Sequence, residues 1–416
     1  MRSLSKRKNK QKFFAPVPVF GQLVSLIQQA NIDHIIAHSL SDKHSKKMKT
    51  KNHLYLMLIA VITRLSSIRE LCALILAHKK SLHQMGLSHI PKRSTISYVN
   101  KHRDSEVFER IYQHLYKRYR SVILDSMQSP ILKRLGKRVV TDSTIVGLFS
   151  SVMRTTGRKA VNGKQKGGIK LHCTIENGMH VPKIHYISEA TVNDQKGIEK
   201  MELERGVIYI MDRGYLNYEF FDKLDEKGVY YVCRMKENAV YERIEEKEIP
   251  DSSDAGIIKD EIIEKALKDG KKIRIRRVAY WDDVSKKTYE YATNLMDIEV
   301  DAIPLLYKSR WQIEITFRQL KQNFGIKYFL GDNENAIKIQ IWCCLIANLL
   351  MTMIHKRVRE RRKDIAFSNV ASFVRLNIHS YVDVVKFLIE KIEDIEKILG
   401  EKINNRELQL SLFESG

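Results

Sequence analysis

The sequence predicts an α/β fold in which the core is interrupted by a mostly β insertion and flanked by helical regions at both ends. Three observations lead to this class. Apolar residues recur at helical spacing from about 18 to 125, short β-branched segments begin at 138, and helical spacing returns at 304. Strands followed by a helix and then another strand are typical of an α/β sheet.

The composition limits the class of protein. A chain of 416 residues predicts two to four domains at about 100–200 residues each. A hydrophobic content of 44% with only 7 prolines excludes a mainly disordered or fibrous protein. The 5 cysteines include no C-x-x-C pair, so we expect reduced thiols in a cytosolic protein and no structural zinc site.

Neither a membrane span nor secretion is expected. The longest apolar run, 341–354, is shorter than the roughly 20 residues that a helix needs to cross a bilayer, so it predicts a buried helix. The basic N-terminus has no apolar signal core after it.

The net charge indicates a polyanionic partner. The chain carries 72 Lys and Arg against 49 Asp and Glu, a formal charge of +23, and nucleic acid is the commonest polyanion. Basic residues are dense in 2–12, 43–51 and 271–277, which favours a long contact path over a single tail. The alternative is a ribosome-associated protein or a cytosolic protein that is merely basic.

The N-terminal part is predicted to be helical. Apolar residues recur at helical spacing from Phe20 to Ile27 and form a more continuous stretch at 54–62. The segment 91–118 is typical of two helices broken near 102–104. A short basic helix of this kind could enter a DNA major groove, as in a helix-turn-helix, or could be an ordinary bundle helix.

The α/β core is predicted from short apolar segments bounded by glycine or polar turns. The expected strands are 138–141, 168–175, 183–188, 207–211 and 229–233, with a helix from Asn217 to Gly228 before the last. Residues 234–300 differ, because a charged stretch precedes two alternating segments that predict antiparallel strands at 272–280 and 288–295. We interpret them as an insertion, since helix-rich sequence resumes at Pro304, and the chain is again helical from about 365.

One predicted helix, 304–324, gathers polar side chains on one side. Pro304 suits its first turn and Gly325 its end. At about 100° per residue, four residues fall on a stripe about 60° wide, separate from the apolar stripe. These residues are Tyr307, Arg310, Glu314 and Lys321. The alternative is a solvated helix face with Arg310 and Glu314 as an i,i+4 ion pair.

Two further acids follow predicted strands. Asp142 ends the strand-like VVT and belongs to TDST, and Asp212 ends VIYIM and belongs to MDRGY. Open α/β sheets bind ligands at such carboxyl ends of strands. Either acid alone could cap a turn. Together with Glu314 they suggest a shared metal site, because carboxylates are ligands that Mg²⁺ prefers and two ions about 3.5–4 Å apart suit phosphoryl transfer. Without cations, three clustered acids would repel one another.

The sequence resembles a bacterial insertion-sequence DDE transposase of the branch marked by Y-(2)-R-(3)-E-(6)-K. Tyr307, Arg310, Glu314 and Lys321 match that spacing without departure. The TDST around Asp142, the DRGY at Asp212 and the RMKEN after the following strand are also similar to the family's blocks. The resemblance covers about 136–355 well and the N-terminal region more loosely.

The resemblance implies an RNase H-like catalytic core, over 136–233 and 301–360, interrupted by a mostly β insertion over 234–300. It further implies a helical N-terminal DNA-end-binding region and a helical C-terminal dimerisation region. These would occupy 1–75 and 361–416, joined to the core by a helical connector over 76–135 that contains the helix-turn-helix candidate.

The resemblance also implies site residues. Asp142, Asp212 and Glu314 would hold two Mg²⁺ ions, for which Mn²⁺ would substitute. Tyr307, Arg310 and Lys321 would contact the phosphate backbone, with the arginine as a bidentate fork.

Four other residues are candidate DNA contacts. Arg234 and Lys236 match basic positions expected to touch the end DNA. Lys170 could face phosphates or lie on a strand surface. Trp281 could stack on a flipped base, which is worth about 1–3 kcal/mol, or could be a core residue.

The expected function is cut-and-paste transposition of an insertion sequence. A homodimer in a paired-end complex would cleave double-stranded DNA at terminal inverted repeats and join the ends to target DNA, in the bacterial cytoplasm at the nucleoid. Two alternatives remain: an RNase H-like structure-specific nuclease, which would cut without paired ends, and a catalytically silent repressor that only binds the repeats.

Overall fold

The computed structural model describes residues 13–399, except 85–86, 88–89, 125–129, 148–157, 160–164, 167, 177, 254–255 and 327. The basic cluster expected at 2–12 and the end of the predicted C-terminal region, 400–416, lie outside the described residues.

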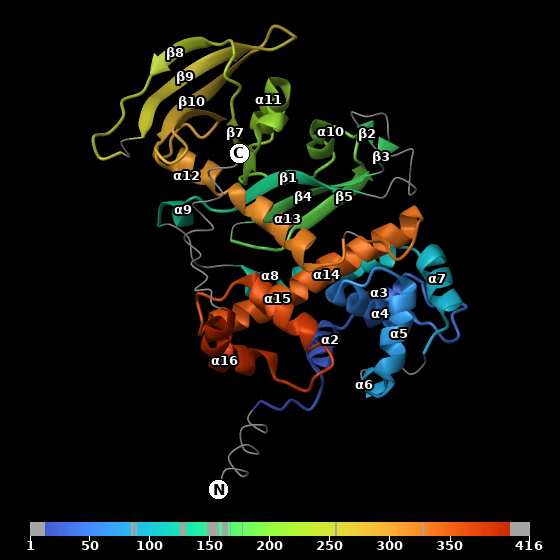
Figure 1. The fold of residues 1–416 in the computed structure, drawn as a ribbon. Helices are drawn as coiled ribbons and strands as arrows, with labels where there is room; N and C mark the ends of the chain where they lie inside the picture. The colour runs from blue at the N-terminus through green and yellow to red at the C-terminus, as the bar shows by residue number, and fades with distance from the viewer. Residues whose placement is uncertain are drawn as a thin grey trace.

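A mixed sheet of nine strands forms the centre of the fold, in the order β5-β4-β1-β6-β7-β11-β10-β9-β8 (Figure 1). The core strands are β1 (Arg138–Gly147), β4 (Gly168–Glu176), β5 (Lys183–Glu189), β6 (Ile208–Met211) and β7 (Tyr230–Arg234). β1 is antiparallel to β4 and parallel to β6, and β6 is parallel to β7. This mixed arrangement confirms the predicted α/β core.

The insertion extends the same sheet. It contributes β8 (Glu242–Glu246), β9 (Ile257–Ala266), β10 (Lys272–Asp282) and β11 (Lys287–Thr293), all antiparallel to their neighbours. β11 pairs with β7 and so joins the insertion to the core. Two strands were predicted and four are present, because β8 and β9 lie in the charged stretch: Asp260 and Glu261 of β9 are buried against arginines of β10.

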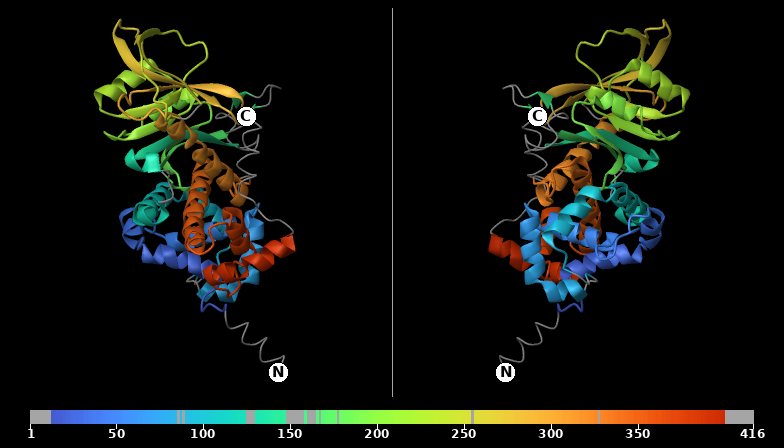
Figure 2. Two further views of the ribbon diagram at one scale, coloured as in Figure 1. Left: turned by 90° about the vertical axis from the view of Figure 1, so that its left-hand side faces the viewer. Right: turned by 90° about the vertical axis from the view of Figure 1, so that its right-hand side faces the viewer.

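The two faces of the core sheet pack against different helices. On one face, α10 (Asp194–Ile198) and α11 (Tyr218–Glu226) cover Val139, Tyr209 and Met211. On the other, Val140 and Ile210 belong to a larger core shared with the helical bundle. Figures 1 and 2 show the sheet in one half of the molecule and the bundle in the other, with α13 (Trp311–Asn323) running between them.

The bundle combines both ends of the chain. Its N-terminal helices are α2 (Val19–Gln29), α3 (Asp33–His38), α4 (Thr50–Thr63), α5 (Ile68–Ala77), α6 (Lys79–Gln84), α7 (Arg93–His102) and α8 (Glu106–Ile123). The short helix α9 (Pro130–Arg134) follows the bundle and lies beside α12 (Ala302–Lys308). The break between α7 and α8 falls at the predicted place. α15 (Phe367–Leu376) and α16 (Val384–Leu399) pack against α14 (Glu334–Arg359), which also contacts α4 and α8.

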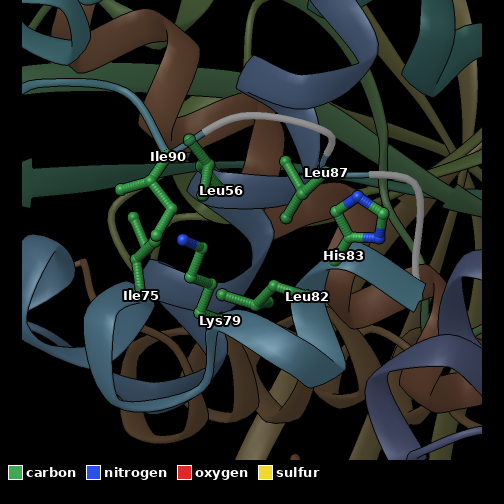
Figure 3. Close-up of a pocket in the computed structure, with 7 residues that line it drawn as sticks. All are labelled: Leu56, Ile75, Lys79, Leu82, His83, Leu87 and Ile90. Carbon is green, nitrogen blue, oxygen red and sulfur yellow. The ribbon is translucent and has the colours of Figure 1, made fainter.

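α14 is long and apolar enough to cross a membrane, but 94% of its most apolar stretch is buried inside the protein. The predicted buried helix at 341–354 is therefore the central helix of the bundle. A small cavity of about 30 Å³ lies beside α4, α5 and α6, lined mainly by aliphatic side chains such as Leu56, Ile75 and Leu82 (Figure 3). It has room for a water molecule or two, so it is a packing gap and not a ligand site.

Candidate active site

The strand register places Asp142 and Asp212 on the same face of the sheet. In the parallel β1/β6 pair, Val140 lies beside Ile210 and Thr141 beside Met211. Because side chains alternate along a strand, Asp142 shares the face of Val140, and Asp212 shares the face of Ile210. Both acids therefore follow the parallel ladder directly and face the bundle side of the sheet.

The prediction that Asp142 ends its strand was wrong. β1 continues to Gly147, because the residues after Asp142 pair with β4 up to Gly168. Only the parallel pairing with β6 stops at Thr141. The acid still lies where the parallel neighbour ends, and this leaves its β6 side open to other side chains.

Two short helices bring the remaining polar residues to these acids. The predicted helix 304–324 is broken into α12 (Ala302–Lys308) and α13, and Pro304 lies in the first turn of α12 as expected. At the junction, the amide of Arg310 donates to the Tyr307 carbonyl and the amide of Ile313 donates to the Arg310 carbonyl. These i→i−3 bonds tighten the chain locally while Arg310 keeps helical dihedral angles, so both helices continue in a similar direction.

The junction places three of the four motif side chains against the strand acids. The Tyr307 hydroxyl donates to Asp212 Oδ1 at 3.4 Å. Arg310 lies 3.5 Å from Asp142 Oδ2 through Nη1 and 2.5 Å from Glu314 Oε1 through Nη2. Arg310 is 13% exposed. The structure thus brings together the predicted acids: Asp142 and Glu314 contact the half-buried Arg310 guanidinium, and Asp212 contacts Tyr307.

The surroundings of Asp142 favour its protonated form. Burial raises the pKa of Asp142 to about 6, against the opposing effects of the Ser143 amide and Arg310, while Asp212 and Glu314 raise it further. Burial by itself would lower the pKa of Arg310, but Tyr307 and Glu314 raise it above its ordinary value. A desolvated carboxylate beside like charges is an environment that a bound cation would relieve.

The donor chemistry fits a divalent cation. Three carboxylates supply the hard oxygen ligands that Mg²⁺ prefers. Within the part of the chain that the structure describes, however, no three His, Cys, Asp or Glu side chains are arranged to hold a metal ion. Arg310 contacts both Asp142 and Glu314, so these side chains would have to reorient around Arg310 to share a cation.

Arg234 adjoins the same cluster, at the end of β7. Its guanidinium lies over the Tyr289 ring, 4.6 Å from the centroid, and its partner in the β7/β11 register is Tyr291. Tyr291 packs on Tyr307 with ring centroids 4.9 Å apart. Neither β11 tyrosine is predicted from the sequence, because nothing in the local pattern of the insertion links it to the motif helix.

Lys236 and Lys321 are exposed. Lys236 follows β7 and lines an open surface cavity of about 410 Å³ with Asn217 and Tyr218. Lys321 is in the last turn of α13. Their contacts with DNA stay predictions.

The expectation that Lys170 faces phosphates is wrong in this structure. Lys170 is 3% exposed, and its ammonium group donates to Asp194 Oδ1 at 2.9 Å and to the Val192 carbonyl at 2.6 Å. Its charge is therefore paired with Asp194 inside the protein. Trp281 is 40% exposed near the end of β10, so it is not a core residue, and its stacking on a base stays a prediction.

Comparison with known proteins identifies the family of this arrangement. Residues 134–350 match the family model described as transposase DDE domain, and residues 17–88 match a domain of unknown function. The chain is 32% identical over 194 residues to a protein of Sinorhizobium fredii named as a transposase; the match covers 46% of this chain and 54% of that protein, about half its length. It is 31% identical over 272 residues to a protein of Synechocystis sp. named as a transposase for an insertion sequence element, covering 63% of this chain and 71% of the relative.

Among solved structures, the chain is similar to a piggyBac transposase from a synaptic complex with hairpin DNA. The sequence identity is 11% and the TM-score 0.37, with 94% of this chain and 84% of that chain covered. The transposase DDE domain model matches more than half of this chain, and the Synechocystis relative is matched over more than two thirds of its length. The chain belongs to the transposase DDE domain family.

Proposed function

We propose that the chain is a DNA transposase that catalyses cut-and-paste transposition of an insertion sequence, by metal-dependent DNA strand cleavage and strand transfer at terminal inverted repeats. One observation carries the proposal. Asp142 and Asp212 share a face of the sheet beyond the β1/β6 ladder, and the α12–α13 junction holds Glu314 through Arg310 beside them.

Family membership implies dependence on a divalent metal. Asp142, Asp212 and Glu314 would hold two Mg²⁺ ions, with Mn²⁺ as a substitute. When bound, such ions supply Lewis acidity for an in-line phosphoryl transfer. The raised pKa of Asp142 supports this role, because a buried acid among acids favours a cation as neighbour.

The motif side chains would bind the DNA backbone around these acids. Arg310 presents a planar fork suited to a phosphate, and it is free to turn toward DNA once cations neutralise Asp142 and Glu314 in its place. Tyr307 would hold the backbone with its hydroxyl group from the other side of the acids. Lys321, Arg234 and Lys236 would extend the phosphate contacts along the end DNA, and Trp281 would stack on a flipped base.

The rest of the chain would bind and pair the ends. The charge of +23 supports double-stranded DNA as the partner, both terminal repeats and target. Residues 1–75 would recognise the repeats, 76–135 would connect them to the core, and 361–416 would pair two protomers in a homodimer. The protein would act at the nucleoid in the bacterial cytoplasm.

The test is cleavage of DNA carrying the element's flanking ends, with Mg²⁺ or with chelator. The wild type should cut at both termini only with Mg²⁺, and Asp212→Asn should bind the ends without cutting. Asp283→Asn, which changes an exposed acid on the β10–β11 turn, is the matched control and should cut normally. Cutting that ignores the ends would favour the nuclease alternative, and end binding without cleavage by the wild type would favour the repressor.

A further inference from the structure

Lys170 belongs to a partly buried chain of polar contacts on the sheet face opposite Asp142. In the antiparallel β1/β4 pair, Ser143 lies opposite His172 and Ile145 opposite Lys170, so these side chains share one face. Asp142 alternates to the other face. Lys170 therefore cannot reach the acid cluster directly, although it lies only three residues along β4 from Cys173, the residue that pairs with Asp142.

The contacts run from the ammonium group to the acid. Lys170 Nζ and Ser143 Oγ both donate to Asp194 Oδ1, at 2.9 and 2.6 Å. The Ser143 backbone amide then donates to Asp142 Oδ1 at 2.7 Å. This leaves Asp142 Oδ2 as the oxygen that faces Arg310. The bond from the Ser143 hydroxyl group to Asp194 thus restrains Ser143, and the bond from the Ser143 amide restrains the Asp142 carboxylate.

Asp194 is itself fixed in place by the docking of α10 on β4. Asn193 caps α10, since its side chain accepts from the Gln195 amide. Further along the helix, Gly197 packs so closely on the His172 ring that a Cβ at this position would collide with it. The His172 ring in turn stacks on Tyr186, with centroids 4.2 Å apart. The carboxylate of Asp194 is consequently held at a set distance from β1.

We propose that Lys170, Asp194 and Ser143 are positioning residues that orient the carboxylate of Asp142 for metal binding; this inference rests on the proposed function. Lys170 neutralises Asp194, Asp194 anchors the Ser143 hydroxyl group, and Ser143 holds one oxygen of Asp142. Hydrogen-bonded partners of a ligating carboxylate typically change metal affinity by about 10–100-fold when they are removed.

Two double variants separate this role from a general effect on folding. Lys170→Met/Asp194→Asn and Lys170→Met/Asp194→Leu both remove the two charges of the Lys170–Asp194 pair, so neither leaves an uncompensated charge beside the buried position 170. Only the asparagine variant keeps an oxygen that can accept from Ser143 Oγ. The probe is Mn²⁺ alone, titrated into the full chain and followed by the electron paramagnetic resonance signal of the free ion.

The asparagine variant should bind Mn²⁺ as the wild type does, and the leucine variant about tenfold more weakly or worse. Ser143→Ala, which deletes one hydroxyl group and keeps the amide, should weaken binding in the same direction even if the leucine variant does not fold. Equal Mn²⁺ affinity in Ser143→Ala and the wild type would overturn the inference.

A second measurement tests the alternative role of Lys170. Binding of a random-sequence DNA duplex, measured against salt concentration, should be the same for the wild type and Lys170→Met/Asp194→Asn. A reduced salt slope in that variant would make Lys170 a phosphate contact and would overturn the inference as well. Absence of Mn²⁺ binding by the wild type would instead refute the proposed metal site itself.

Discussion

Arginines lie beside acids, mostly away from solvent, both in the insertion and at the acid cluster, and these two regions differ in how the charges are matched. In the insertion, Arg276 donates two hydrogen bonds to Asp260, of 2.8 and 2.6 Å, and both side chains are 3% exposed. Arg276 also donates to the carbonyls of Leu295 and Ile298 in the loop after β11. In the core, Arg310 is shared between Asp142 and Glu314, and Asp212 accepts from a tyrosine instead.

The difference teaches how to tell a structural ion pair from a site. Arg276 and Asp260 satisfy each other, and they fasten β9 and β10 to the loop that leads toward α12. Around Arg310 the acids exceed the cation, and the pKa of Asp142 is raised to about 6. Unmatched charge held away from solvent costs stability, so its presence where the parallel β1/β6 pairing ends indicates a place where a ligand binds.

The largest effect is expected from neutralising the unmatched acids. Asp142→Asn, Asp212→Asn or Glu314→Gln should each abolish DNA cleavage in the presence of Mg²⁺ and retain end binding. Because each change removes a like charge, the metal-free protein should unfold at the same or higher urea concentration than the wild type. Cleavage at the wild-type rate by any of the three would contradict the assignment of that acid.

The matched pair should respond in the opposite way. Arg276→Met leaves Asp260 buried without its counter-ion, and we expect a loss of about 3–5 kcal/mol in the free energy of unfolding, measured in urea. Arg276→Met/Asp260→Leu should recover most of this loss. If the single variant is as stable as the wild type, the insertion pair is not structural and the contrast between the two regions fails.

The acid cluster should also make the stability of the protein depend on pH through Asp142. A carboxyl group whose pKa rises on folding, here from an ordinary 3.8 to about 6, contributes stability below the lower value and loses it as pH rises through the higher one. The free energy of unfolding of the metal-free wild type, measured relative to that of Asp142→Asn, should therefore fall by at most about 3 kcal/mol between about pH 4 and pH 7. Urea unfolding in chelator across this range measures the difference, and a constant difference would refute the raised pKa.

Local patterns predicted most of the elements, and long-range contacts account for the misses. The periodicity of 304–324 placed Tyr307, Arg310 and Glu314 on one side, and the structure brings them to the strand acids. The break at Ser309 and Arg310 leaves no mark in the apolar pattern, since both residues keep helical dihedral angles.

Charged residues that are buried in the structure account for two wrong predictions, the missed strand β9 and the role of Lys170. Asp260 and Glu261 look like surface residues until their partners on β10 are known, so β9 was missed as a strand. Lys170 looked available to phosphates because Asp194, its partner, lies 24 residues away on a short helix. No spacing rule links such a pair, and only the packing of α10 on β4 reveals it.

The smallest effect is expected at the edge of the acid cluster. Lys236 is exposed beside an open cavity, so Lys236→Gln should weaken binding of the end DNA without altering stability. One lost phosphate contact should reduce the slope of log affinity against log salt by about 1. Lys268→Gln, an equally exposed lysine on the β9–β10 turn, should leave the slope unchanged. Equal slopes for both variants would place the DNA path away from β7, and the excess positive charge of the chain would then act through another face.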